Sequence, residues 1–417
     1  MRVLLGTLTL VAALAAAACS GNGSDAEGVV TLQLSAEAEE AAVYRTLIAE
    51  FERTHPGTRI RMDAIASKAD HIQKLNTLFA GGEPPDLFLV NYREFSQYVA
   101  RGAIEPIEPL LDSVPIEDYY PEPIDAFTYE GQLQCFPQNI SSLVVYYNEA
   151  LFEEAGLQRP ADDWTFEDFR RTALALTRPG VHGAGIEPSI IRLAPFAWSN
   201  GGEIVDDPVR PARFTLEDPA TREALEFLVD LARRDEVVPS EQDVAAQDLE
   251  TRFTTGKLGM LLSSRKETPV FREATQLRWD VAPLPRSSQP ASILHSDAYC
   301  LSRGNADNEA ALDFVRFAIG PGGQTITAIG GRTVPSLISV AESGAFLNPV
   351  QPPAHAEVFL DAIDEMRRTP VIPTWPEIED VAEEFLTRAF YDESYSIDRA
   401  IDEMDDATRD LFEEGTS

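Results

Sequence analysis

The stretch from residue 29 to residue 102 restricts the fold more than any other part of the chain, because short apolar strands alternate there with amphipathic helices. Strands are expected at 29–34, 60–64 and 86–90, and helices at 43–51, 72–79 and 93–100. Apolar residues recur at helical spacing within each helix, and glycines follow the last two. This strand and helix order predicts an α/β fold with a parallel sheet covered by helices on both faces.

The length of the chain predicts a second lobe, because 417 residues exceed what one hydrophobic core usually serves. After residue 131 the pattern predicts strands at 143–147 and 279–285, a helix at 220–234 and a helix or turn that feeds a strand at 253–262. A further helix is expected at 308–319, and the acidic run 378–412 is predicted to be helical.

The first 18 residues are predicted to be a secretory signal peptide. Arg2 is their only charged residue, and residues 3–18 form an apolar run that is short for a membrane span. No later segment approaches 18 uncharged apolar residues, so we expect an exported protein without a spanning helix. The net charge of −35 disfavours nucleic acid and anionic lipid surfaces as partners.

Cys19 is the predicted first residue of the mature chain and a candidate for lipid attachment. The preceding alanines resemble the bacterial lipobox, although Ala16 stands where leucine is usual, and Ala16 and Ala18 also suit an ordinary signal peptidase. An acylated Cys19 would anchor the protein at the outer face of the cell membrane or in the periplasm. Residues 19–28 are polar and small, and we expect a flexible linker there.

An ordered set of motifs carries a family resemblance that extends over nearly the whole mature chain. The motifs are GGEPPDLFLV, CFPQNISSLVVYYNEALFEEAGL, WTFEDF, the Gly201 and Gly202 pair, FTTGKLGM, VAPLP and VPS near Pro335. In this order they resemble the carbohydrate-type extracellular solute-binding proteins that feed ABC importers. The resemblance implies a two-lobe, periplasmic-binding-protein-like fold in which each lobe has a mostly parallel sheet flanked by helices.

The resemblance also implies where the chain crosses between lobes. Lobe 1 would comprise 29–134 and 301–348, and lobe 2 would comprise 138–297 and 354–417, with hinge strands at 131–137 and 298–301. The final helices would wrap back onto lobe 2. Cys135 and Cys300 would then lie on crossings that run side by side, which permits a disulfide; buried free thiols are the alternative.

The implied function is that of the substrate-binding component of an ABC importer. Such a protein captures a sugar or related polyol in the cleft between its lobes and delivers it to membrane permease subunits. We expect a monomer that is not an enzyme and needs neither a cofactor nor a metal.

Eight residues are predicted to contact the ligand. Two tryptophans could stack on a sugar ring: Trp198, which precedes a pair of glycines, and Trp375, which lies between prolines. The alternative for both is burial in the hydrophobic core. Trp164 and Trp279 are expected to be scaffold. Six polar residues follow strands or lie in loops, where they could form hydrogen bonds with ligand hydroxyl groups. The alternative for each is turn capping or solvation. They are Glu37, Asn91, Asn139, Ser264, Asp297 and Arg332.

Two other functions are alternatives. A secreted glycoside-acting enzyme could use a pair among the 69 acidic residues, but the chain has no GxSxG, HExxH or Walker motif, and its five histidines show no ligand spacing. A receptor for a metal or an anion could use Tyr146 and Tyr147, although these tyrosines read more simply as part of a buried strand. His295 could join the cleft, but a lone histidine is more often an ordinary hydrogen-bonding residue.

Overall fold

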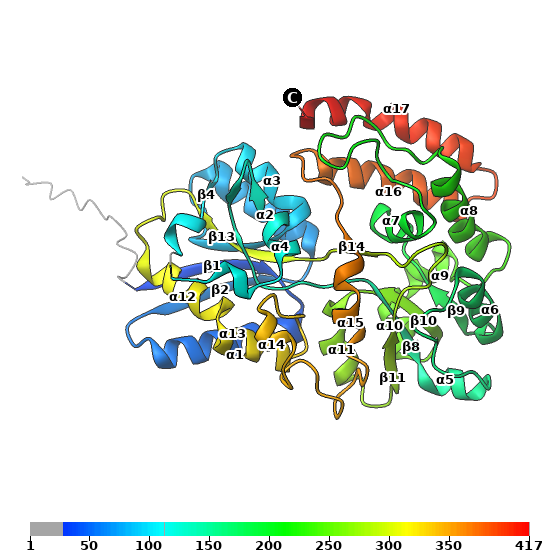
Figure 1. Ribbon diagram of the computed structural model, residues 1–417, viewed down its shortest axis with the longest axis horizontal. Coiled ribbons are helices and arrows are strands. Elements are labelled where there is room, and N and C mark those ends of the chain that lie inside the picture. The colour runs from blue at the N-terminus through cyan, green and yellow to red at the C-terminus, as the bar shows by residue number, and fades with distance from the viewer. Residues whose placement is uncertain (1–27, 112, 417) are drawn as a thin grey trace, which may run out of the picture.

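The computed structural model describes residues 28–111 and 113–416. Two sheets with flanking helices form the left and right halves of the molecule in Figure 1. The predicted signal peptide, Cys19 and all but the last residue of the predicted linker lie outside the described residues. Within the described part, no helix combines the length and the apolar character that a membrane span requires.

The first lobe is built on the sheet β2-β1-β3-β13-β4, with β7 paired to β13. The pairs of β1 with β2 and with β3 are parallel, which confirms the strand and helix order predicted at the start of the chain. Its elements are β1 (Val29–Ser35), α1 (Ala38–Thr54), β2 (Arg59–Ile65), α2 (Lys68–Gly81), β3 (Leu87–Asn91), α3 (Tyr92–Ala100), β4 (Ile104–Glu105), α4 (Pro121–Ala126), β5 (Thr128–Tyr129), β6 (Gln132–Leu133), β7 (Phe136–Pro137), β13 (Asp297–Ser302), α12 (Glu309–Ile319), α13 (Pro321–Ile329) and α14 (Ile338–Ala341).

The second lobe is built on the sheet β11-β8-β10-β9. Its elements are β8 (Val144–Asn148), α5 (Glu149–Glu154), α6 (Phe166–Leu176), β9 (His182–Gly185), α7 (Ile190–Ser199), α8 (Pro219–Arg233), α9 (Glu241–Ala246), α10 (Leu249–Thr254), β10 (Leu258–Ser263), α11 (Thr268–Glu273) and β11 (Trp279–Ala282). Between and after the lobes come β12 (Ser292–Ile293), α15 (Val358–Asp361), β14 (Met366–Arg367), α16 (Trp375–Tyr391) and α17 (Ile397–Thr416).

The prediction of a mostly parallel sheet is wrong for the second lobe. There β8 runs antiparallel to both β10 and β11, and only β9 is parallel to β10. The reason is that β8 enters directly from the segment that connects the lobes, without a crossover helix to set a parallel direction. For the same reason β13, which returns from the second lobe, runs antiparallel to β3 and β4.

The two segments predicted to be hinge strands pair with each other inside the first sheet. Phe136 lies opposite Tyr299, and the neighbouring Cys135 and Cys300 form a disulfide. The chain then passes to the second lobe, and a bridge between Ser141 and His295 joins the outgoing and returning segments. The disulfide therefore ties the two crossings together at the edge of the first lobe, while the predicted domain boundaries stay predictions.

Removal of this disulfide is expected to lower the free energy of unfolding by about 2–5 kcal/mol, because the bond closes a long loop in the unfolded chain. The two cysteines are 165 residues apart in sequence. Urea unfolding of Cys135→Ala/Cys300→Ala should show this loss. Reductant should destabilise the wild-type protein and leave the double variant unchanged; an equal response of both proteins would contradict the prediction.

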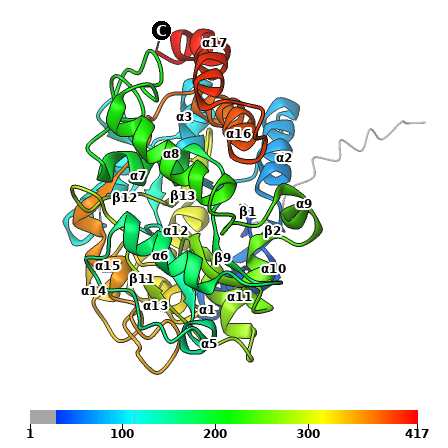
Figure 2. The same ribbon diagram turned by 90° about the vertical axis from the view of Figure 1, so that its right-hand side faces the viewer.

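The C-terminal helices α16 and α17 pack against each other along the top of the right half in Figure 1. The contacts of α16 with α7 and α8 agree with the predicted return to the second lobe, but α16 also contacts α3 of the first lobe. Figure 2 shows α16 and α3 from a second direction. Helix α16 therefore belongs to the boundary between the lobes.

Candidate functional site

A cavity of about 500 Å³ lies between the two lobes. The first lobe contributes Arg93 of α3 to the wall of this cavity. The second lobe contributes the loop before α7, the helix α9 and one face of α16. The lining residues are Arg93, Glu187, Pro188, Ser189, Ile190, Ile191, Glu241, Val244, Ala245, Glu379, Glu383, Thr387 and Tyr391. We call this cavity the interlobe pocket; its volume is typical of small-molecule sites.

A hydrogen-bonded chain of side chains runs from the hinge side of the first lobe to the interlobe pocket. Asp297 accepts hydrogen bonds from Asn91 Nδ2 (3.1 Å) and from an Nη of Arg332 (3.4 Å). Asn91 Oδ1 in turn accepts from Arg93 Nε at 3.2 Å, and Arg93 forms an ion pair with Glu379 of α16. Four linked side chains, Arg332, Asp297, Asn91 and Arg93, thus connect the first lobe to Glu379 of the opposite lobe.

The structure brings four of the predicted polar residues together: Asn91, Asn139, Asp297 and Arg332. Asn139 is buried, and its Oδ1 accepts the backbone N–H of Asp297 at 2.8 Å. Arg332 is also buried, and its Nε lies 2.9 Å from a carboxylate oxygen of Glu40. Since Asn91 caps α3 with the same side chain that binds Asp297, its amide serves both helix and cluster.

The other two polar predictions lie outside this cluster. Glu37 is solvent-exposed and caps α1 in a capping box with Glu40. The backbone carbonyl of Ser264 accepts the hydroxyl of Tyr146 at 2.9 Å. Glu37 therefore shows the capping role that was the alternative to ligand contact, while ligand contact by the Ser264 side chain stays a prediction.

The predicted stacking faces of Trp198 and Trp375 are not at the surface of the pocket. Trp198 is 1% exposed and lies under the guanidinium of Arg367, 4.7 Å from the ring centre. Trp375 is 0% exposed and donates its Nε1–H to Glu379 at 2.6 Å. This burial contradicts direct ligand contact, because each indole already fills the interior of the second lobe.

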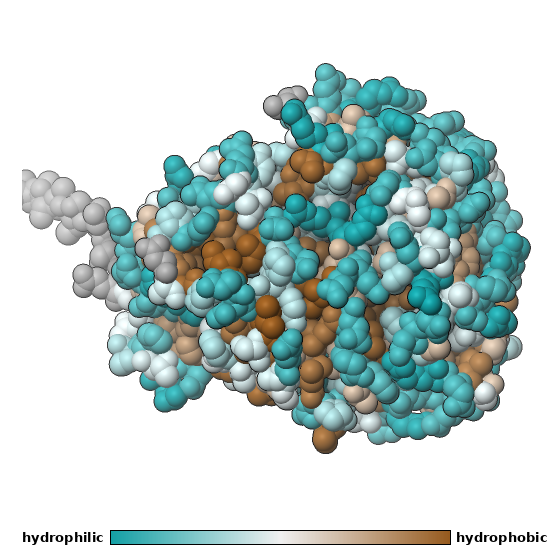
Figure 3. Space-filling model, in the orientation of Figure 1, coloured by the Kyte–Doolittle hydropathy of each residue, from teal (hydrophilic) through white to brown (hydrophobic). Residues whose placement is uncertain are grey.

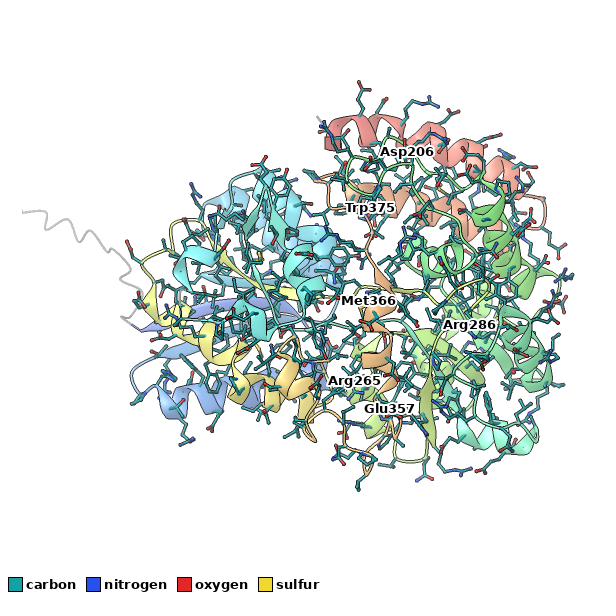
Figure 4. The ribbon with its side chains drawn as sticks, viewed as in Figure 1. Asp206, Arg265, Arg286, Glu357, Met366 and Trp375 are labelled. Carbon is teal, nitrogen blue, oxygen red and sulfur yellow. A yellow bond between two sulfur atoms is a disulfide. The ribbon has the colours of Figure 1, made fainter. Side chains whose placement is uncertain are left out.

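Figure 4 shows Trp375 at the start of α16 and Arg265 lower along the same boundary between the lobes. Arg265 donates its Nε–H to the carbonyl of Gly331 at 3.1 Å, so it links the second lobe to the loop that carries Arg332. In Figure 3, hydrophobic residues reach the surface mainly over the first lobe and along the junction of the two lobes. The boundary thus combines apolar packing with the polar chain described above.

Burial and close charges shift the pKa values of several groups in this region. Burial raises the pKa of Glu40, although Arg332 partly opposes the shift. Burial alone would disfavour the Arg332 cation, but Glu40 and its other neighbours outweigh that cost and raise the pKa of Arg332. Burial and four cations, Arg93, Arg192, Lys266 and Lys68, lower the pKa of His295, which keeps its imidazole neutral.

A second group of charges surrounds Lys266, beside the pocket. Burial raises the pKa of Glu250 to about 7, and the nearby Glu267 and Glu187 add to that effect. Arg192 is buried and binds Glu187, which lines the pocket, at 2.8 Å. The wall of the second lobe is therefore rich in carboxylates, some of which are already paired.

The sequence reasoning missed most of the pocket wall, including Arg93, Glu187, Glu379 and Glu383. Arg93 lies two residues after β3, so the rule used for Asn91 could have found it, whereas the sequence pattern predicts no strand before Glu187. Glu379 and Glu383 belong to α16, and nothing in their spacing distinguishes a pocket wall from a solvated helix face.

The alternative of a metal receptor is not supported by a site in the described residues. The hydroxyl of Tyr146 is buried and bonded to Ser264 and Thr268, and Tyr147 is also buried, so this pair is not arranged to hold a ligand. Within residues 28–111 and 113–416 there is no group of three or more His, Cys, Asp or Glu side chains suited to a metal ion.

Comparison with known proteins gives consistent matches. Residues 46–354 match the family described as bacterial extracellular solute-binding protein. The mannitol-binding protein of Pseudomonas aeruginosa is 22% identical over 73% of this chain and 72% of its own. An uncharacterized lipoprotein of Streptomyces antibioticus is 23% identical over 79% and 76% of the two chains.

Solved structures share the fold. An ABC substrate-binding protein of Listeria monocytogenes, solved in complex with cycloalternan, superposes with a TM-score of 0.86 at 24% identity. The match covers 93% of this chain and 99% of that one. This likeness confirms the two-lobe fold predicted from the sequence motifs.

Proposed function

The chain belongs to the bacterial extracellular solute-binding protein family, and we propose that it captures a sugar or related polyol and delivers it to the permease subunits of an ABC importer. The observation that supports this most directly is the interlobe pocket, which both lobes line and which lies beside a connected polar chain. Such a pocket can close around a solute and release it unchanged, since binding needs only hydrogen-bond partners and exclusion of water.

The choice of a hydroxyl-rich solute rests on the polar groups of the boundary and on the relatives. Asp297, Asn91, Arg332 and the pocket carboxylates supply both donors and acceptors, as hydroxyl groups require. A relative named as a mannitol-binding protein and a structural neighbour holding cycloalternan support the same class of ligand. The protein would act as a monomer, without a cofactor and without catalysis.

The proposed location is the outer face of the cell membrane or the periplasm, with Cys19 acylated. The apolar residues 3–18 and the small residues before Cys19 support export and lipid attachment. The relative named as a lipoprotein supports the anchor. Contact with the membrane would be limited to the acyl chains and the permeases.

Binding should appear as saturable stabilisation by at least one sugar or polyol. At a ligand concentration of one hundred times Kd, the free energy of unfolding should rise by about 2.7 kcal/mol. A thermal melt against hexoses, hexitols and oligosaccharides measures this, and chromatography of the recovered ligand tests whether it is intact. No stabilisation by any member, or recovery of a cleaved glycoside, would refute the proposal.

A further inference from the structure

Provided that the chain is the sugar or polyol receptor proposed above, we infer that its pocket selects a ligand of single-sugar size without an anionic group. Carboxylates, instead of aromatic rings, hold this ligand. Glu383 determines the specificity for it. Two independent observations carry the inference: the position of the tryptophans and the charges that line the pocket.

All four tryptophans of the chain lie in the interior. Trp164, Trp198, Trp279 and Trp375 are 4%, 1%, 3% and 0% exposed. Two are anchored through Nε1 to backbone carbonyls of their own lobe: Trp164 to Pro283 and Trp279 to Phe271. A movement of the lobes apart would leave these contacts in place, because both partners move together.

The other two indoles are held in the same lobe by aromatic and cationic neighbours. Trp375 packs edge-on against Phe214 and Phe412, and Arg367 covers Trp198. Among the described residues that line the pocket, Tyr391 is the one aromatic side chain. Stacking along several sugar rings needs several exposed aromatic faces, so the pocket is not built for an extended oligosaccharide.

The pocket wall carries four carboxylates, Glu187, Glu241, Glu379 and Glu383, and one cation, Arg93. Arg93 is already paired with Glu379, and Arg192 behind the wall is paired with Glu187. Neither Glu241 nor Glu383 forms an ion pair with any residue in the described part of the chain. An anionic ligand would be repelled by this wall, whereas a hydroxyl group can donate to a carboxylate without adding charge.

Glu383 is the best placed of the free carboxylates. It lies one helical turn from Glu379 on α16, on the face that also presents Thr387 to the pocket. Partial desolvation raises the pKa of Glu383, with Glu187, Asp380 and Glu379 adding to the shift and Arg192 opposing it, although the residue is solvent-exposed. None of the described residues donates a hydrogen bond to this carboxylate, so a ligand hydroxyl can bind it without displacing a protein donor.

Two polar atoms close to the pocket also lack partners. Arg192 is only 5% exposed, and its Nε, like Ser189 Oγ in the pocket wall, has no hydrogen-bond partner in the described part of the chain. Because unpaired buried polar atoms are costly, these groups point to a small polar ligand in the neighbouring space. They supply a donor and a hydroxyl, which complement the carboxylates of the wall.

Calorimetric titration of the purified protein can test this selection. The probes are a panel of hexoses and hexitols, the corresponding hexose 6-phosphates, and di- and trisaccharides of the same hexoses. We expect one neutral single-sugar probe to bind at least about tenfold more tightly than its phosphate and its oligomers.

Two variants on α16 form a matched pair for the same titration. Glu383→Gln should weaken binding of that probe by about tenfold to a hundredfold, the usual range for loss of a charged hydrogen-bond partner. Glu384→Gln, at an exposed neighbouring position outside the pocket wall, should leave the affinity unchanged.

Each outcome separates this inference from the proposed function. Equal or tighter binding of a trisaccharide or a phosphate, or equal affinities of the two variants, would overturn the inference and leave a sugar receptor standing. Absence of binding by every probe would overturn both.

Discussion

Replacing Glu379 by glutamine should lower the free energy of unfolding by about 3–5 kcal/mol, because it leaves Arg93 as a buried cation without a counter-charge. The two side chains are only 9% and 14% exposed, so water screens the pair little. Glutamine keeps an acceptor oxygen for the indole N–H of Trp375, which also binds Glu379. The loss should therefore report on the charge of Glu379 and not on the helix start.

The double variant Arg93→Met/Glu379→Gln supplies the control. Removal of both charges should recover much of the stability, since neither side chain is then an unpaired buried charge. Arg53→Met, in the exposed ion pair of Arg53 with Glu50, should cause no measurable change in urea unfolding. Additive losses in the double variant would show that Arg93 and Glu379 do not act as a pair.

The same ion pair joins α3 of the first lobe to α16, so its loss should also loosen the lobes. Burial disfavours the Arg93 cation, but Glu379 and the other neighbours outweigh that cost and raise the pKa of Arg93. Small-angle scattering should show a larger radius of gyration for Glu379→Gln than for the wild-type protein. An unchanged radius would place the closing contacts elsewhere, for example at Arg265.

The fold of the first lobe could be predicted because the sequence of each strand and helix there has the apolar spacing and end signals typical of that element. The helix α2 ends where Gly82 adopts a left-handed φ of 74°, a conformation that glycine accepts at little cost. The direction of the second sheet could not be predicted in this way. Every residue of β8 and β10 is buried, and a continuous apolar run looks the same in a parallel and an antiparallel sheet.

The candidate site could be predicted where it lies at the ends of strands. Asn91 and Asn139 were predicted from that position, and the structure connects both of them to Asp297, which also binds Arg332. Residues of α16 could not be found, because the helix reaches the pocket only through tertiary packing. Local sequence was also ambiguous for the tryptophans, since an indole beside glycine or proline can serve a cleft or a core.

Replacing Trp375 by alanine distinguishes these two roles, and we expect a loss of about 3–5 kcal/mol in the free energy of unfolding, the cost of a large cavity in a core. The side chain is fully buried and lies 6.2 Å from Phe214 and 6.3 Å from Phe412, measured between ring centres. Trp375→Phe should lose less, because it keeps most of the apolar contact and forfeits the hydrogen bond to Glu379.

Ligand affinity, measured well below the melting temperature of each variant, completes the test of Trp375. Because the indole does not line the pocket, Trp375→Phe should bind the ligand with unchanged affinity once folded. Leu174→Ala removes an exposed apolar side chain on α6 and should alter neither stability nor affinity appreciably. A Trp375→Phe protein of nearly normal stability whose affinity falls tenfold would instead place Trp375 against the ligand, and would require a pocket that reaches the start of α16.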